Sequence, residues 1–393
     1  MKLMITAYNI PPVCNAFSNV VGSLFKDWEY CEFFFITGDK RVSTKIIDLN
    51  FIISNSQYVC DIPPYLRKKS FRINLPVYLE HLLLPLIILK MLYIEIKEKP
   101  DAIFAMIPTH IYIISSFVVA KICRLPLFCY LVDEWQLTRP HWLQRSVAKF
   151  FESKVMKFSR NIFFMTDTLK DIYIKRYPQI NCNKFHTLPL PTDLVLNKRN
   201  INKIINPAEE IVICFTGAIY NAQKQAIYNL VKAINYIKSY NIKLQLITFA
   251  DKEVLQRQGI QGEFIEVLRA TRSEVIGYQR KADILFLPMS FLGDKDIVTT
   301  ASIPSKLLEY IVSGTPILVH APLYTFLGKY TKEKEFGYLV SENSFVKLAE
   351  AIEEMILNPD LQKKLVKRAE ELYTIHNHKN VSKQLWEYLN LNI

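Results

Sequence analysis

The stretch Ile303-Pro304-Ser305-Lys306-Leu307-Leu308-Glu309-Tyr310-Ile311-Val312-Ser313-Gly314-Thr315-Pro316-Ile317 decides the fold, because it predicts a helix followed directly by a buried strand. Proline is tolerated in the first turn of a helix, so we expect the helix at 304–312. Gly314 is typical of the residue just past a helix end, and the apolar strand 316–320 follows it. Another apolar strand, 283–287, precedes the helix. The stretch therefore predicts a β-α-β unit with parallel strands.

The same alternation runs along the whole chain. Predicted strands of the first half lie at 4–8, 32–36, 102–106, 127–131 and 161–165, and those of the second half at 210–216, 243–249, 283–287 and 316–320. Predicted helices lie at 78–97, 112–123, 142–158, 223–239, 271–281, 304–312, 344–357, 359–373 and 381–389. Apolar strands between amphipathic helices predict parallel sheets that are covered on both faces.

Two long apolar runs, 82–94 and 111–122, raise the question of a membrane span. The first contains Pro85 and Lys90, and the second contains two serines and Lys121. Both are shorter than the roughly 20 residues that a spanning helix needs. We therefore expect two buried helices.

The length of 393 residues favours two domains. We expect a first domain over 1–196, a polar linker over 197–208 and a second domain over 209–377, with a last helix at 378–393 that packs back on the first domain. In two consecutive α/β domains a ligand binds at the carboxyl ends of the strands, in the cleft between them. The functional residues should lie in loops that follow strands.

Composition and charge exclude several classes of protein. Half of the residues are hydrophobic and only ten are glycine, which excludes a disordered chain and a glycine-rich phosphate loop. The formal net charge of +12 favours anionic partners. Seven cysteines without CxxC spacing favour reduced thiols over a disulfide framework or a zinc site. The N-terminal segment lacks a small-residue cleavage site, so we expect a first strand and a cytoplasmic protein.

The polar residues of the helix at 304–312 suit an anionic ligand. A helix N-terminus that faces a cleft offers N–H groups to an anion, and here Ser305 adds a hydroxyl and Lys306 a positive charge. Glu309 lies four residues after Ser305, on the same face, where its carboxylate can accept both hydroxyls of a ribose. We expect Glu309 on the cleft face, outside the core. The spacing alone also allows a helix whose polar residues merely face water.

The sequence of this helix resembles the nucleotide-binding motif of retaining glycosyltransferases of family 4, which have the GT-B fold. Residues 215–220 resemble the glycine loop that opens the C-terminal domain of that family, and 282–288 resemble the strand before its donor loop. The resemblance is good over 210–320 and extends to 188–193 at the domain junction. It implies an α/β protein with two Rossmann-like domains whose parallel sheets face a central cleft.

The resemblance implies a hexosyltransferase-type enzyme that moves a sugar from a nucleoside diphosphate sugar to a hydroxyl acceptor, with retention. Lys306 and the helix end would stabilise the leaving diphosphate, and Glu309 would hold the ribose. The expected substrate-binding residues of this half are Gly217, Ala218, Lys224, Thr300, Ser305, Lys306 and Glu309. We expect no cofactor beyond the nucleotide sugar. The acceptor would be a glycan or lipid-linked saccharide, such as a surface polysaccharide precursor.

Some positions depart from the family pattern. Ala301 stands eight residues before Glu309, where the family often has a second Glu. Ala218 replaces an Arg that often follows the loop glycine, and Lys224 falls one position later than the usual Lys. Asp294-Lys295-Asp296 has the Asp-x-Asp pattern of Mn²⁺ sites, but we expect a metal-free donor loop in which one Asp replaces the missing carboxylate.

The first half offers weaker candidates. Asp133 and Glu134 directly follow the strand at 127–131, where the usual His-Asp pair of the family is missing. We expect Asp133 to act as a catalytic residue that orients the acceptor and Glu134 to bind substrate, although either carboxylate could instead cap the next loop. Asn15 follows the first strand and could bind the acceptor.

A basic cluster suggests where the protein works. Arg67-Lys68-Lys69 and Arg72, interleaved with Phe71, precede the apolar helix. Basic and aromatic residues together suit an anionic membrane, so we expect peripheral binding at the inner face of the plasma membrane. No known nucleic-acid module is present, so we expect no nucleic-acid partner.

Two rival functions fit the same architecture. A nucleotide-sugar epimerase has two such domains but needs acid and base carboxylates in its cleft. A partner subunit that has lost catalysis would bind nucleotide weakly, and Ala301 together with the missing His-Asp pair is consistent with it.

Overall fold

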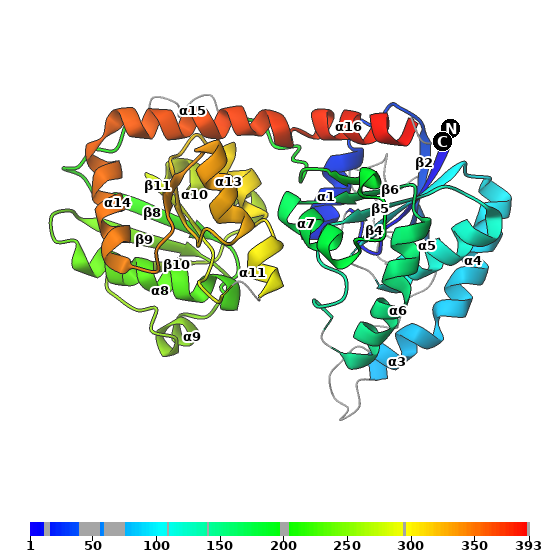
Figure 1. Ribbon diagram of the computed structural model, residues 1–393. Helices are drawn as coiled ribbons and strands as arrows, with labels where there is room; N and C mark the ends of the chain where they lie inside the picture. The colour runs from blue at the N-terminus through cyan, green and yellow to red at the C-terminus, as the bar shows by residue number, and fades with distance from the viewer. Residues whose placement is uncertain are drawn as a thin grey trace. The chain divides into compact units, whose positions relative to one another are not determined.

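The computed structural model describes residues 1–11, 16–38, 56–58, 75–107, 110–139, 141–196, 204–293 and 296–390. The chain divides into two compact units, whose helices and strands are labelled in Figure 1. The first unit comprises Met1–Asp193 and Asn377–Ile393, and the second comprises Leu194–His376. Of the linker expected at 197–208, residues 197–203 lie outside the described residues, and 204–208 belong to the second unit.

Within the described residues, the first unit contains a seven-stranded sheet in the order β3-β2-β1-β4-β5-β6-β7, and every pairing is parallel. Its strands are β1 (Lys2–Thr6), β2 (Glu32–Thr37), β3 (Ser56–Tyr58), β4 (Ala102–Ile107), β5 (Leu127–Leu131), β6 (Asn161–Phe164) and β7 (Phe185–Thr187). Every residue of β4, β5 and β6 is buried, as expected for strands covered on both faces.

Helices α1 (Ala16–Phe25), α3 (Leu75–Leu82), α4 (Leu84–Glu98), α5 (His110–Cys123), α6 (Trp142–Phe158), α7 (Asp167–Arg176) and α16 (His378–Asn390) and the 3₁₀ turn η3 (Cys182–Lys184) complete the first unit. The helix predicted at 78–97 is in fact two helices that meet at Leu83, because Pro85 suits the first turn of a new helix.

The expectation that both apolar helices are buried is correct for α5 and wrong for α4. Ten residues of α5 are buried, whereas α4 buries Ile87, Met91 and Ile94. The physical reason is that α4 packs on α5 along one side only, so its other side remains on the surface.

The C-terminal helix α16 belongs to the first unit and packs on α1. Val381, Leu385 and Leu389 are buried at one side of the helix. The Ser382 hydroxyl donates to the carbonyl of Leu24 at 2.5 Å. A segment far away in the sequence therefore completes the core beside the first helix.

Among the described residues, the second unit contains a six-stranded parallel sheet in the order β10-β9-β8-β11-β12-β13. Its strands are β8 (Ile211–Thr216), β9 (Ile242–Ile247), β10 (Ile265–Leu268), β11 (Ile284–Pro288), β12 (Ile317–His320) and β13 (Tyr338–Val340). Its helices are α8 (Asn221–Tyr236), α9 (Lys252–Arg257), α10 (Arg272–Lys281), α11 (Ile297–Ala301), α12 (Lys306–Ile311), α13 (Phe326–Lys334), α14 (Phe345–Leu357) and α15 (Pro359–His376).

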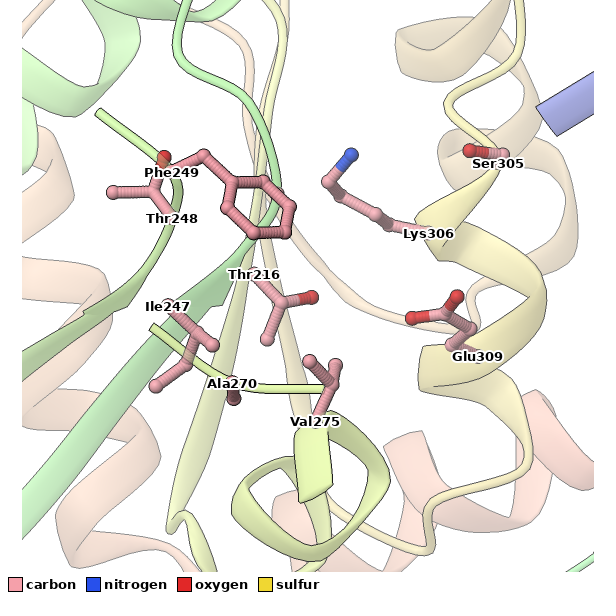
Figure 2. A pocket seen from close by; sticks show the side chains of 10 residues that line it. Thr216, Ile247, Thr248, Phe249, Ala270, Val275, Ser305, Lys306 and Glu309 are labelled. Carbon is pink, nitrogen blue, oxygen red and sulfur yellow. The ribbon is translucent and has the colours of Figure 1, made fainter. Parts of the chain in front are cut away.

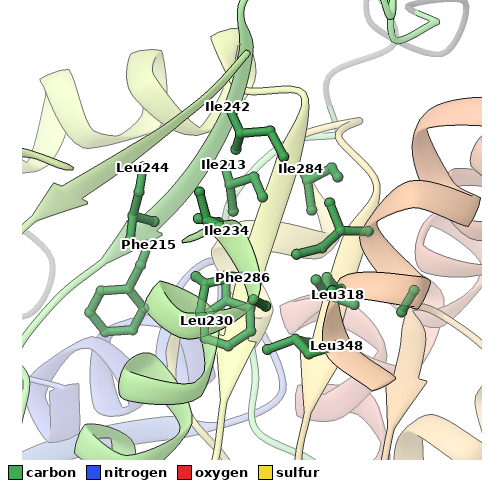
Figure 3. Close-up of a cluster of buried hydrophobic side chains, with 14 of the residues drawn as sticks. Ile213, Phe215, Leu230, Ile234, Ile242, Leu244, Ile284, Phe286, Leu318 and Leu348 are labelled. Atoms are coloured by element: carbon green, nitrogen blue, oxygen red, sulfur yellow. The ribbon is translucent and has the colours of Figure 1, made fainter. Parts of the chain in front are cut away.

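The core of the second unit lies between its sheet and the helix pair α8 and α14 (Figure 3). Strand residues such as Phe215 and Phe286 meet Leu230 of α8 and Leu348 of α14. Burial of these apolar side chains is the main favourable term in folding. Within the sheet, β8 pairs with β9 in parallel, from Ile211 opposite Ile242 to Thr216 opposite Ile247, so that their carboxyl ends reach the same edge.

The packing of α16 yields a test. Leu385→Ala should lower the free energy of unfolding by about 2–5 kcal/mol, because the change leaves a cavity in a fully buried site. Lys383→Ala, on the exposed side of the same helix, should change it by less than about 0.5 kcal/mol. Urea denaturation of both variants measures the difference. Equal stabilities would mean that α16 contributes little to the first unit.

Candidate functional site

A pocket of about 170 Å³ opens at the carboxyl ends of β8 and β9 in the second unit. Its lining comes from the ends of β8 and β9 and the residues after them, from the segment that enters α10, and from the start of α12, and Figure 2 shows the side chains around it. The lining residues are Thr216, Gly217, Ile247, Thr248, Phe249, Ala270, Val275, Ser305, Lys306 and Glu309. Four residues predicted from the sequence therefore line one pocket, namely Gly217, Ser305, Lys306 and Glu309.

Gly217 is required where β8 ends. Its φ of +118° is a backbone conformation that side-chain-bearing residues rarely adopt. A Cβ atom at this position would lie 1.8 Å from Cε of Lys306 and 2.3 Å from its Nζ. The absence of a side chain therefore lets the lysine lie directly over the backbone at the end of the strand.

The helix at the pocket is shorter than predicted. It begins at Lys306 and ends at Ile311, instead of covering 304–312. The amides of Leu307 and Leu308 already donate to Pro304 and Ser305 in the first turn. The exposed Ser305 makes no side-chain capping bond. A helix of six residues has a small dipole, so the charge of Lys306 must supply most of the attraction for an anion.

Two buried side chains fix α12 against the end of β8. The hydroxyl of Tyr310 accepts a hydrogen bond from the amide of Thr216 at 3.0 Å. The amide Nε2 of Gln279, in α10, donates to Thr216 Oγ1 at 3.0 Å and to Glu309 Oε2 at 2.8 Å. The carboxylate of Glu309 is therefore positioned by a neighbouring helix and still borders the pocket (Figure 2).

The ammonium of Lys306 favours an anion in the pocket. Burial lowers the pKa of its ammonium below the ordinary value, and the Glu309 carboxylate offsets part of this effect. A cation that has lost water is stabilised by an incoming negative charge. The pocket thus combines one cation for an anionic group with one carboxylate acceptor for hydroxyls.

Three other predicted residues of this unit do not line the pocket. Ala218 is exposed beyond Gly217, Lys224 lies in the first turn of α8, and Thr300 lies in α11, where its amide donates to the Asp296 carbonyl. The turn after Gly217 carries Ala218 and Lys224 away from the pocket, and Thr300 belongs to the separate helix α11, which does not line it.

The prediction that Glu134 binds substrate is wrong on geometric grounds. Its carboxylate is buried, accepts from Arg176 Nη1 at 2.5 Å and also accepts from the amide of Leu137. Arg176 also reaches the buried Glu152 at 3.1 Å. Glu134 therefore holds the loop after β5 in place, which is the capping role that the sequence left open.

Asp133 remains at the carboxyl end of β5, half-buried, in the first unit. Asn15 lies outside the described residues, as do Asp294 and Lys295 of the predicted donor loop.

A hydrogen-bonded histidine pair lies near the same edge of the first sheet. The indole Nε1 of Trp135 donates to Nδ1 of His110 at 3.1 Å, which places the proton of a neutral His110 on Nε2. Nε2 of His110 then donates to His81 Nε2 at 3.3 Å. Burial, and next the positive charges of His81 and Arg139, lower the pKa of His110 to about 3. His110 is therefore neutral, and its hydrogen bonds to Trp135 and His81 are structural.

Sequence reasoning missed Gln279, Thr248 and Phe249. Gln279 is almost fully buried in α10, and nothing in its local sequence marks it as a partner of Glu309. Thr248 and Phe249 directly follow β9, so the rule that sites lie after strands could have found them.

The conformation of Gly217 yields a prediction. Gly217→Ala should lower the free energy of unfolding of the second unit by about 1–3 kcal/mol, because the strained backbone remains even if Lys306 moves away. Gly277→Ala is the matched control: it lies in α10, where an added methyl group would meet no atom within 4 Å, and it should stabilise by about 0.5–1 kcal/mol. Urea denaturation of each variant measures both. Equal shifts in the two variants would contradict the special role of Gly217.

Comparison with known proteins agrees with this geometry. Residues 197–372 match the family Glycosyl transferases group 1. No curated protein matches the chain by sequence. HepE from Anabaena, solved in complex with UDP-glucose, is 14% identical with a TM-score of 0.69, and the alignment covers 99% of each chain.

Two further solved structures are similar over the whole chain. Sucrose-phosphate synthase from Thermosynechococcus elongatus is 13% identical with a TM-score of 0.67, covering 99% of this chain and 98% of its own. UDP-GlcNAc 2-epimerase from Neisseria meningitidis, bound to UDP-GlcNAc, is 14% identical with a TM-score of 0.55, covering 100% of both. At such identities the likeness concerns the fold. The chain therefore has the GT-B fold, with two Rossmann-like domains, and its residues 197–372 match the Glycosyl transferases group 1 family.

Proposed function

We propose that this protein is a glycosyltransferase that moves a sugar from a uridine diphosphate sugar to a hydroxyl acceptor, with retention. The observation that carries the proposal is the pocket in which Lys306 and Glu309 meet Gly217 at the end of β8, inside the region that matches the group 1 family. Uridine is favoured because two similar structures were solved with UDP-glucose and UDP-GlcNAc bound.

The chemistry required of this chain is mainly electrostatic. As the bond to the sugar breaks, negative charge grows on the diphosphate, and Lys306 is positioned to stabilise it. Since burial lowers the pKa of Lys306, an anion beside it should restore that pKa and gain binding energy. A diphosphate oxygen can take the acceptor proton on the same face of the sugar, so the proposal needs no protein base. Asp133 would orient the acceptor.

The acceptor is proposed to be a lipid-linked saccharide, such as a surface polysaccharide precursor, at the inner face of the plasma membrane. The basic residues that first suggested this, Arg67-Lys68-Lys69 and Arg72, lie outside the described residues. The overall charge of +12 supports an anionic surface as partner.

One set of assays distinguishes the proposed function from its two rivals. A panel of nucleotide sugars is tested for thermal stabilisation of the protein, since ligand binding raises the apparent stability. The stabilising sugar is then incubated with the protein alone and with membrane lipid extract. Transfer of labelled sugar to lipid supports the proposal. Conversion of the donor without acceptor supports an epimerase, and stabilisation without turnover supports a partner subunit.

Glu309 provides the sharpest test of the donor site. Removal of a charged hydrogen-bond partner costs about 1.5–3 kcal/mol, so Glu309→Ala should weaken UDP binding by about ten- to over a hundredfold. Glu309→Gln should be milder because one acceptor oxygen remains, and Ser305→Ala should be milder because the backbone amides remain. Calorimetric titration with UDP measures each affinity. Unchanged affinity in folded Glu309→Ala would mean that α12 is structural.

The structure changes one expectation about this variant. A position outside the core, as expected from the sequence, would make Glu309→Ala nearly neutral for stability, but Glu309 accepts a hydrogen bond from the buried Gln279. Glu309→Ala should therefore also destabilise the second unit by about 1–3 kcal/mol, and affinity must be measured well below the unfolding temperature. Glu333→Ala, an exposed residue of α13, is the matched control for both measurements.

Turnover is predicted to need no divalent metal, because the helix N-terminus and Lys306 together offset the charge of the diphosphate. Chelator should leave the rate of sugar transfer unchanged within about twofold, and Mn²⁺ should not raise it. Asp294→Ala and Asp296→Ala are assayed beside the wild type. If chelator abolishes transfer and Mn²⁺ restores it only in the wild type, the Asp-x-Asp sequence binds metal and the donor-loop interpretation is wrong.

A further inference from the structure

The surface of α4 carries an uninterrupted apolar stripe. Leu86, Leu89, Tyr93 and Ile96 follow one another at spacings of three and four residues, and Leu82 at the end of α3 continues the series. Their exposed fractions are 71% for Leu82, 56% for Leu86, 62% for Leu89, 67% for Tyr93 and 70% for Ile96. Scattered exposed apolar residues are ordinary, but a contiguous stripe marks an interaction surface.

The helix has two opposite faces of different character. With about 100° per residue, the apolar stripe of α4 falls within an arc of about 80°. The buried residues Ile87, Met91 and Ile94 lie on the opposite side, where α4 packs on α5. The helix is therefore already bound along one side, and it lies at the outer margin of its unit in Figure 1.

The charges beside the stripe have one sign. Lys90 and Lys97 are exposed and lie along one edge of it. The acidic residues of α4 are only partly exposed and turn toward the inner side, where Glu98 pairs with Lys2 at 2.7 Å and lies 3.9 Å from the ammonium of Lys97. An apolar stripe flanked by lysines is complementary to the acyl boundary and headgroups of an anionic bilayer.

Pairing with a second copy of the chain is less favourable. The spacing of the stripe is that of a coiled-coil seam, in which Lys90 and Lys97 take the flanking e positions. The other flanking positions hold Pro85 and Leu92. In either orientation of a symmetric pair, the lysines would meet lysines or apolar residues, so charge complementarity is absent.

Crossing the bilayer is also less favourable. The segment Val77–Glu98 is long and apolar enough to span, with a mean hydropathy of 1.7 and 17% of its window buried. However, α4 could insert only by separating from α5, which would expose the buried side chains of Ile87, Met91 and Ile94 to lipid. A helix that keeps one side on its own unit presents only the other side to the membrane.

We propose that the stripe of Leu82, Leu86, Leu89, Tyr93 and Ile96, with Lys90 and Lys97, docks the first unit on an anionic membrane surface with α4 lying in the plane of the interface. The inference adds to the proposed function the surface that meets the lipid. It rests on the proposed function in one respect, namely that the acceptor is carried by a lipid. Vesicle binding and UDP binding are measured separately, so that either can fail alone.

The test uses the full chain and sedimentation with vesicles of phosphatidylcholine alone or mixed with phosphatidylglycerol. The variant with Leu86→Gln, Leu89→Gln and Tyr93→Gln should bind mixed vesicles at least about tenfold more weakly, because each change removes buried apolar area. Leu357→Gln, equally exposed on α14, is the control and should bind like the wild type. All variants should keep the UDP affinity of the wild type.

The charged edge is tested independently. The variant with Lys90→Gln and Lys97→Gln should lose about fivefold in vesicle affinity per lysine and depend less on salt. Lys363→Gln with Lys367→Gln, both exposed on α15, is the matched control. The proposal is overturned if all variants bind mixed vesicles with the same affinity as the wild type. Absence of binding by the wild type also overturns it, as does a dimer in solution that the triple variant abolishes.

Discussion

The hydroxyl of Tyr310 is the contact on which the candidate site depends. Because this hydroxyl accepts a hydrogen bond from the amide of Thr216, it joins the short helix α12 to the last residue of β8. Gln279 joins the same two elements to α10 through Thr216 and Glu309. A six-residue helix has little stability of its own, so these buried hydrogen bonds hold Lys306 and Glu309 at the pocket. Binding chemistry in this unit is thus supported by side chains that never need to touch a ligand.

The two units use their buried polar groups differently. In the second unit, Lys306 is partly desolvated, and its charge faces a pocket that an anion can enter. In the first unit, Glu134 and Glu152 share Arg176, and His110 is neutral between Trp135 and His81. Those groups satisfy one another and stabilise the loop after β5. Burial alone therefore does not mark a functional residue; what matters is whether its partner is another side chain or an open pocket.

The exposed face of α4 is a feature that the packing of the described residues of the first unit does not explain. Folding buries one side of the helix against α5 and leaves a stripe of large apolar side chains in water. The free energy of such a surface is lowered by contact with another apolar phase. Under the proposed docking, the flanking lysines favour an apolar phase with negative charge at its boundary. The proposed membrane surface and the candidate nucleotide pocket lie in separate units of one chain.

The sequence by itself determined the parallel α/β class, the central strands and the residues of α12, because long apolar runs and a helix between strands are local signals. Strand 127–131 was predicted with the bounds that β5 has, whereas short edge strands such as β10 and β13 were missed because three or four residues carry little pattern. The tertiary structure alone decided which polar side chains are available to bind a ligand. The sequence offered both Glu134 and Glu309 as substrate-binding candidates, but packing gives the first an arginine and the second a pocket. It also decided that α4 is half exposed, since the same apolar composition serves a buried helix and a surface one, and only the position of α5 distinguishes them.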